Sequence, residues 1–261
     1  MNGAALSLAI ESLQPHVLAI SLISARLIPV AFLCPLFGGS HAPSHVKLGT
    51  VLALALFVHF AGGIGAPHAA TAFELGALMV KEVVFGLTLG LIAALPFDIA
   101  RMGGRFIDLF RGSSAEAALP LAGTKESATG DALYHLLLAL GAVGLVGPAM
   151  LGALTRSYGL VPLGSFHQTE ELAFEVVRLV GGAFSTGLAI GAPIAALALA
   201  IDACLGLASR AAPNMNLQET GAPLRILGGG AVLWLGISLL ATRLQDVAMM
   251  YVDELESISR L

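Results

Sequence analysis

The chain has 261 residues, of which 57% are hydrophobic and 11% are charged, well below the roughly 25% charged residues of ordinary soluble domains. Too few polar side chains are present to cover a soluble core, so we expect an integral membrane protein. The net charge of −4 excludes the basic surface that is typical of nucleic-acid-binding proteins.

Six apolar segments follow one another along the chain and predict an all-α membrane protein. Residues 1–15 contain Glu11 and Pro15 and are expected at the membrane interface, whereas the tail after the last segment is amphipathic and acidic. The second segment is short, because a helix needs about 20 residues to span the hydrocarbon core. The segments cover residues 17–37, 48–61, 73–97, 132–154, 171–207 and 226–244.

Charged residues lie inside several of these segments, where they are costly in hydrocarbon and should face protein or water. Two interpretations stay open: salt pairing within the chain, or helices that do not lie in lipid. Glycines at small-xxx-small spacing, Gly86 with Gly90 and Gly187 with Gly191, allow close helix contacts either within the chain or with other subunits. The internal charges are Arg26, Lys81, Glu82, Arg178 and Asp202.

The only long polar interruption is the stretch 98–130. Its charged residues recur at steps of three and four, so they share one helix face and each can pair with the next. From Gly112 small residues dominate, and Pro120 and Gly123 disfavour a regular helix. We predict a short amphipathic helix that leads into a Gly/Ala/Ser loop; the simplest alternative is a solvated surface helix and loop. The charged face is Asp98, Arg101, Arg105 and Asp108, and the apolar face is Ile99, Met102, Phe106, Leu109 and Phe110.

A compact turn is predicted at 210–225, which reads R-A-A-P-N-M-N-L-Q-E-T-G-A-P-L-R. In a six-span arrangement, seven of the Lys and Arg residues outside the apolar segments fall on one side and three on the other. This bias places the first side in the cytoplasm and both chain termini in the periplasm. The seven are Lys47, Arg101, Arg105, Arg111, Lys125, Arg210 and Arg225; the three are Arg156, Arg243 and Arg260.

The sequence contains no recognisable catalytic or metal-binding motif. His41 and His45 flank Pro43 in a turn and would need further ligands to hold a metal. Cys34 and Cys204 lie in apolar runs and are expected as buried free thiols. There is no phosphate-binding glycine loop and no nucleophile elbow at Ser113 and Ser114. We therefore predict a protein that is not an enzyme and needs no cofactor or metal.

The ordered motifs resemble those of one family, the T component of the type III secretion export gate (the FliR/SctT family), over about residues 20–245. The sequence departs from the family at Leu119, where an Asp commonly precedes the proline. The motifs are Arg26 with Pro35, Gly38, Pro43 and Lys47; K-E-V-V-F-G-L-T-L-G at 81–90; G-G-R-F-I-D-L-F-R-G-S-S-A at 103–115; P-L-A-G-T-K-E-S at 120–127; D-A-C-L-G-L-A-S-R-A-A-P-N-M-N at 202–216; and G-A-P-L-R at 221–225.

The resemblance implies one export-gate membrane domain over 1–261, similar to a fusion of the two other gate components: an R-like part at 1–170 and an S-like helical hairpin at 171–261. It implies a plug at 106–124 and a cytoplasm-facing hairpin tip. The implied plug residues are Phe106, Leu109, Phe110, Gly112, Ser113, Ser114 and Pro120, and the implied tip residues are Arg210, Pro213, Asn214, Asn216 and Arg225.

The function implied is a subunit of a protein-conducting gate in the bacterial inner membrane. Its implied partners are the R and S components, the switch (U) component, the large export-gate protein, membrane lipids and unfolded secreted proteins, with no nucleic acid. Arg111-Gly112 after Asp108 favours the secretion branch, whereas Gly221 before Ala222-Pro223 favours the flagellar one. A small-solute transporter is a third reading, but it should show paired broken helices in two repeat halves.

Overall fold

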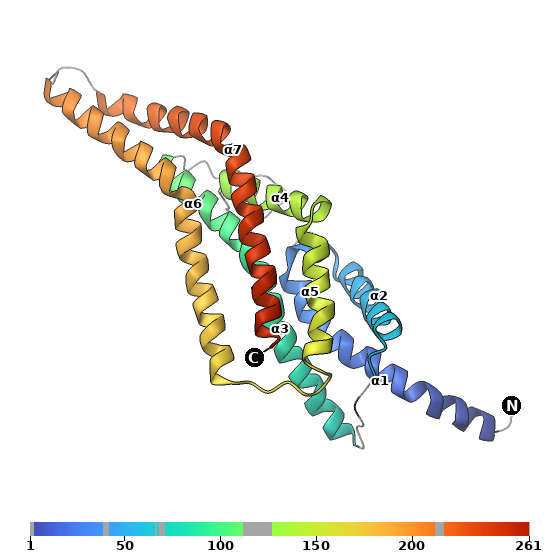
Figure 1. The fold of residues 1–261 in the computed structure, drawn as a ribbon. Helices are drawn as coiled ribbons and strands as arrows, with labels where there is room; N and C mark the ends of the chain where they lie inside the picture. Colours follow the sequence, from blue (N-terminus) through green and yellow to red (C-terminus); the bar gives the residue numbers. More distant parts are fainter. Residues whose placement is uncertain are drawn as a thin grey trace. The chain divides into compact units, whose positions relative to one another are not determined.

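The computed structural model describes residues 3–38, 42–65, 67, 71–111, 127–211 and 217–260. Every element in these ranges is helical, as the sequence predicts, and Figure 1 traces them from blue to red. The elements are α1 (Gly3–Leu33), the short 3₁₀ helix η1 (Pro35–Phe37), α2 (Ser44–Gly62), α3 (Ala72–Arg111), α4 (Ala128–Val143), α5 (Val146–Leu160), α6 (Glu170–Ala211) and α7 (Leu217–Ile258).

Five of these helices are long and apolar enough to cross a membrane, and the number rises to six if α4 and α5 together form one broken span. The prediction of about six hydrophobic helices is therefore confirmed in its coarse form. The second segment is longer than expected, since α2 extends over 19 residues. Residues 3–15 form the first part of α1.

Three predicted boundaries are wrong. The segment 132–154 breaks between α4 and α5, where Gly144, Gly147 and Pro148 weaken the helix and Pro148 lacks a backbone donor. The amphipathic stretch is not a separate short helix, because α3 runs through Pro96 without interruption to Arg111. The turn at 210–225 is also shorter than predicted, since α7 begins at Leu217 and contains Pro223.

The chain divides into two compact units. Unit 1 contains residues 1–94, 144–177 and 249–261, and unit 2 contains residues 95–143 and 178–248. The helices α3, α6 and α7 each contribute to both units. In unit 1, α2 lies beside α1 (Figure 1), and their facing side chains form an apolar core together with α5. The core residues are Leu22, Ile23, Leu27, Ala31, Val51, Ala55, Val58, Tyr158 and Leu163.

The spaced glycines allow close contacts between helices of this chain. The interpretation that they serve packing within the chain is therefore confirmed. In unit 1, a Cβ atom on Gly90 would lie 3.0 Å from Cα of Val30 on α1. In unit 2, a Cβ atom on Gly191 of α6 would lie 2.9 Å from Cβ of Phe106 on α3. These approaches are closer than ordinary side-chain packing, so only glycine fits without displacement.

Two predicted buried thiols have different surroundings. Cys34 is buried in unit 1, with its Sγ 3.6 Å from Sδ of Met150. Cys204 is exposed on α6, so the expectation that it is buried is wrong. An apolar neighbourhood in sequence places a residue on a hydrophobic helix but does not decide whether its face is covered by the same chain.

Candidate functional site

Unit 1 contains an ion pair in its interior. Nε of Arg26 on α1 lies 2.6 Å from Oε2 of Glu82 on α3, and the two side chains are 1% and 0% exposed. Both residues belong to helices that are candidate membrane spans. A buried guanidinium or carboxylate without a partner would be strongly unfavourable, so each of these two side chains can be buried only because the other one is present. The interpretation of these two charges as an intrachain salt pair is confirmed.

The remaining nitrogens of Arg26 reach the end of α5. Nη1 donates to the carbonyl oxygen of Ser157 at 3.3 Å, and Nη2 donates to that of Val161 at 3.0 Å. The Ser157 carbonyl also accepts from the Val161 amide at 2.9 Å, so the guanidinium is a second donor to it. The C-terminal end of a helix carries partial negative charge, so a cation is favoured there. The guanidinium also lies over the rings of Phe85 and Tyr158, at 4.8 and 4.3 Å from their centroids. Arg26 thus caps α5 from within the protein.

Glu82 holds the backbone that follows α5. Its Oε1 accepts a hydrogen bond from the Gly164 amide at 2.7 Å, and Nζ of Lys81 donates to the Gly164 carbonyl at 3.5 Å. Gly164 has a φ of +78°, which is accessible to glycine at little cost. Irregular backbone at membrane depth is tolerated where protein surrounds it and satisfies its polar groups. We call Arg26, Glu82, Ser157, Val161 and Gly164 the α5 cap.

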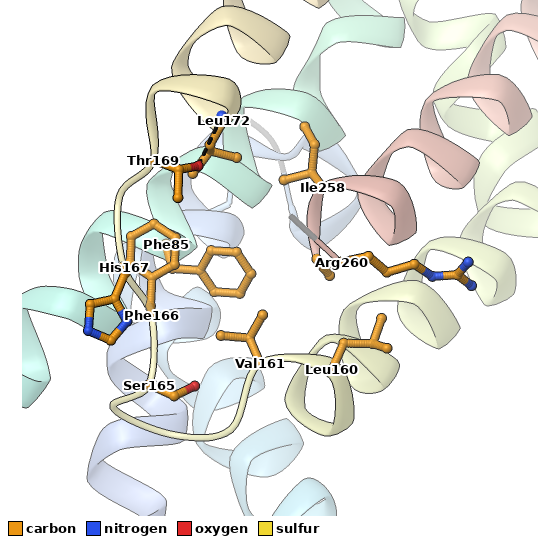
Figure 2. Close-up of a pocket in the computed structure, with 11 residues that line it drawn as sticks. Phe85, Leu160, Val161, Ser165, Phe166, His167, Thr169, Leu172, Ile258 and Arg260 are labelled. Atoms are coloured by element: carbon orange, nitrogen blue, oxygen red, sulfur yellow. Dashed lines mark hydrogen bonds between the residues drawn. The ribbon is translucent and has the colours of Figure 1, made fainter.

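A cavity of about 250 Å³ lies beside the α5 cap in unit 1 (Figure 2). Phe85 and Val161 point into it, whereas the ring of His167 and the guanidinium of Arg260 point away. The hydroxyl of Thr169 is engaged at the start of α6, where it accepts from the Leu172 amide at 3.2 Å. Polar groups therefore do not converge on a bound substrate. The described residues also include no group of three side chains that could hold a metal ion.

In unit 2, one carboxylate joins the end of α3 to the start of α4. Asp108 accepts hydrogen bonds from the Thr129 amide, at 3.0 Å, and from the Thr129 hydroxyl. Its side chain is nearly buried, and Nη1 of Arg111 lies 3.8 Å from its Oδ1. An acidic group near a helix N-terminus is favoured by the exposed amides there. The residues on either side of the connection 112–126 are therefore tied together by Asp108.

A second contact between α3 and α4 lies two turns earlier. Nε of Arg101 lies 3.8 Å from Oδ1 of Asp131, and the guanidinium lies 4.1 Å from the centroid of the Tyr134 ring. Between these contacts the two backbones meet at Gly104 and Gly130, where a Cβ atom on either glycine would collide with the other helix. The face of α3 that carries Arg101 and Asp108 therefore packs on α4.

The predicted charged face is thus not simply a solvated surface, because α4 supplies partners to Arg101 and Asp108. On the predicted apolar face, Phe106 packs against α6, but Leu109 is 71% exposed, so the expectation that it is packed does not hold within this chain. Phe110 is half-buried. The helix spacing identified the face correctly but not the extent to which this chain covers it. Gly112, Ser113, Ser114 and Pro120 lie outside the described residues.

At the hairpin, Asp202 of α6 pairs with Arg225 of α7, with Oδ2 and Nη1 3.3 Å apart, and both side chains are partly exposed. Arg210 is exposed in the last turn of α6. Pro213, Asn214 and Asn216 lie outside the described residues. Arg225 therefore belongs to a helix that packs on α6, not to a loop.

Sequence reasoning missed the partners on α4, namely Thr129, Asp131 and Tyr134. A signal was present: Ser127 precedes the helix, and its Oγ accepts from the Gly130 amide at 2.9 Å, as an N-cap serine does. A cap at Ser127 would have placed the start of the helix at residue 128 and brought Thr129 and Asp131 onto its first turn.

Comparison with known proteins agrees with this architecture. The family described as "Bacterial export proteins, family 1" matches residues 17–250. The chain is 25% identical to the flagellar biosynthetic protein FliR of Caulobacter vibrioides, over 89% of this chain and 91% of that protein. It is 31% identical to the Yop proteins translocation protein T of Yersinia pestis, over 69% and 70%. It is 25% identical to the surface presentation of antigens protein SpaR of Shigella sonnei, over 83% and 84%. The chain therefore belongs to the FliR/SctT family of bacterial export proteins, which are non-enzymatic, multi-pass membrane components of an export gate.

Proposed function

We propose that this chain is the T component of the export gate of a type III secretion system in the bacterial inner membrane. The observation that carries the choice of branch is the 31% identity to the Yop proteins translocation protein T, over 185 residues. The flagellar branch is the second candidate, because relatives with the name FliR match over a larger share of the chain, 89% and 93%.

Deletion of the gene discriminates the two branches. A secretion gate predicts loss of secreted effector proteins from the culture medium with unchanged swimming. A flagellar gate predicts loss of flagellar filaments and of swimming with unchanged effector secretion. The matched control is the deletion strain that carries the intact gene on a plasmid.

We propose that the chain completes a ring with the R and S components and that its 171–261 part is an S-like hairpin. Support comes from unit 2, where α6 and α7 run antiparallel (Figure 1): a Cβ atom on Gly221 would lie 3.0 Å from Cδ1 of Leu205, whereas one on Gly228 would lie 3.4 Å from Cδ1 of Ile201. The hairpin leaves large apolar side chains exposed, including Trp234, at 78%. Such a surface needs lipid or protein to cover it. After extraction in mild detergent, the chain should co-purify with the R and S components; a stable, monodisperse protein without partners would contradict the proposal.

We propose that residues 106–124 plug the export path while the gate is idle. Two features support this: the small side chains of 112–115, 117 and 118 in the sequence, and the Asp108–Thr129 contact that joins the residues on either side of the connection. Apolar burial of Phe110, worth about 1.5–3 kcal/mol, should contribute more to closure than a partly exposed charge pair at Arg101, worth a few tenths of a kcal/mol.

Deletion of 112–119 should leave assembly intact and make the inner membrane permeable to ions or small solutes. Phe110→Ala should leak more than Arg101→Ala. If the deletion strain assembles its gate normally and its membrane is as tight as that of the wild type, the plug proposal is wrong.

A further inference from the structure

Arg111, the last residue of α3, reaches across unit 2 to α7. Its Nη2 donates to the carbonyl oxygen of Ile226 at 3.1 Å, while its Nη1 lies 3.8 Å from Oδ1 of Asp108. The side chain is 17% exposed, so water competes little for these groups. One guanidinium therefore faces a helix carbonyl and a carboxylate with two different nitrogens, which the planar fork of arginine allows and a lysine ammonium does not reproduce.

Three successive glycines lie on α7, Gly228, Gly229 and Gly230, and the side chain of Arg111 passes over the last two of them. A Cβ atom on Gly229 would lie 2.6 Å from Cγ and 2.9 Å from Cδ of Arg111, so the side chain would have to move. On Gly230 it would meet only the flexible Nη2, at 3.4 Å. On Gly228 it would meet side chains of α6 instead, at ordinary distances of 3.4 and 3.5 Å. The space for the arginine therefore depends on Gly229.

Asp108 extends the contact to a third helix, because it also accepts from the amide and the hydroxyl of Thr129 on α4. The end of α3, the start of α4 and the glycine segment of α7 thus meet through two neighbouring charged side chains. All of these residues lie in unit 2.

We propose that Arg111 is a positioning residue that fixes α7 to the joined ends of α3 and α4, and that Gly229 is required to seat it. We call Arg111, Asp108, Thr129, Ile226 and Gly229 the Arg111 latch. The latch makes the α6–α7 hairpin and the helix ends at residues 111 and 128 move as one body. The proposal rests on the function of the chain as a gate subunit, since its effect is measured on the assembled gate.

The test compares two neighbouring glycine-to-alanine substitutions, one of which should stabilise α7 without further effect while the other should displace Arg111. Alanine is a better helix former than glycine, so a substitution without a steric consequence should stabilise α7. Gly228→Ala is therefore the matched control and should leave the gate tight. Gly229→Ala carries the same helix-propensity gain but displaces Arg111, so it should loosen the latch.

The variants are made in the intact chain, expressed with its partners. The idle leak of a small solute across the inner membrane is measured per assembled gate, with the amount of gate taken from native gels. Arg111→Ala removes one charge-assisted hydrogen bond, which predicts about a tenfold rise in leak. Arg111→Lys should lie close to Arg111→Ala, and Gly229→Ala should leak several-fold more than Gly228→Ala. Because Gly229 acts only through the arginine, Gly229→Ala should add nothing in the Arg111→Ala background.

Three results would overturn the latch. The first is a leak for Gly229→Ala equal to that of Gly228→Ala, and the second is an undiminished effect of Gly229→Ala in the Arg111→Ala background. The third is a smaller amount of assembled gate for Arg111→Ala with an unchanged leak per gate. The last result would mean that Arg111 serves folding alone. These outcomes are distinguishable from failure of the proposed function, in which the wild-type chain would not assemble with R and S components at all.

Discussion

Replacement of Arg26 by methionine tests the α5 cap most directly. The variant keeps an apolar stem of similar length but removes the guanidinium, which leaves Glu82 buried without its cation and the Val161 carbonyl without its guanidinium donor, whereas the Ser157 carbonyl keeps the Val161 amide. Removal of one partner from a buried ion pair costs about 3–5 kcal/mol. At about 2–4 °C per kcal/mol for a chain of this size, the midpoint of thermal unfolding should fall by about 10 °C.

The measurement is the unfolding midpoint of the detergent-extracted gate, followed by size-exclusion chromatography after heating. Arg243→Met, which replaces an exposed arginine on α7, is the control and should be close to wild type. The double variant Arg26→Met with Glu82→Met should recover part of the loss, because no buried charge remains, although the Val161 carbonyl still lacks its guanidinium donor. A midpoint for Arg26→Met within about 2 °C of the wild type would refute the reasoning, because so small a shift is below 1 kcal/mol.

Three further outcomes are expected. Gly90→Val should lower the amount of folded protein in the membrane, as judged by immunoblot, because α1 and α3 are too close there for a side chain; Gly76→Val, where a Cβ atom would meet open space, should not. Thr129→Val should weaken the hold on Asp108 and expose the connection 112–126 to added protease faster than in the wild type, and equal rates would contradict the contact. The charge bias of the sequence predicts that both termini lie in the periplasm, so a cysteine in place of Gln218 should react with a membrane-impermeant maleimide only from the cytoplasm, and labelling from the periplasm alone would reverse the predicted topology.

The class of the protein and the charged residues inside its apolar segments could be predicted from sequence. Charges are costly in hydrocarbon, so Arg26 and Glu82 had to lie against protein or water, and their pairing is one of the two readings that follow. The contacts of Arg26 with Ser157 and Val161 could not be predicted, because they use backbone carbonyls 131 and 135 residues away, which carry no side-chain signal.

The charged stretch at the end of α3 shows the same limit in unit 2. Periodicity identifies which residues share a helix face, so it could be predicted that Asp108 and Arg101 have charged or polar partners. It does not say which helix covers that face, and here α4 covers it with Thr129, Asp131 and Tyr134. Leu109 shows the converse, since it is an apolar residue at the correct spacing that stays exposed because none of the described helices packs on it.

The α5 cap also sets an order of events during synthesis. Arg26 is made 56 residues before Glu82 and 135 residues before Val161. At roughly 5–20 residues per second, the arginine precedes its carboxylate by about 3–11 s and its last acceptor by about 7–27 s. Until then α1 carries an uncompensated cation, so it should be retained beside the insertion machinery until α3 arrives. The short helix α5 can end inside the protein only after that pair has formed, so insertion of this chain should proceed in strict sequence from α1 to α5.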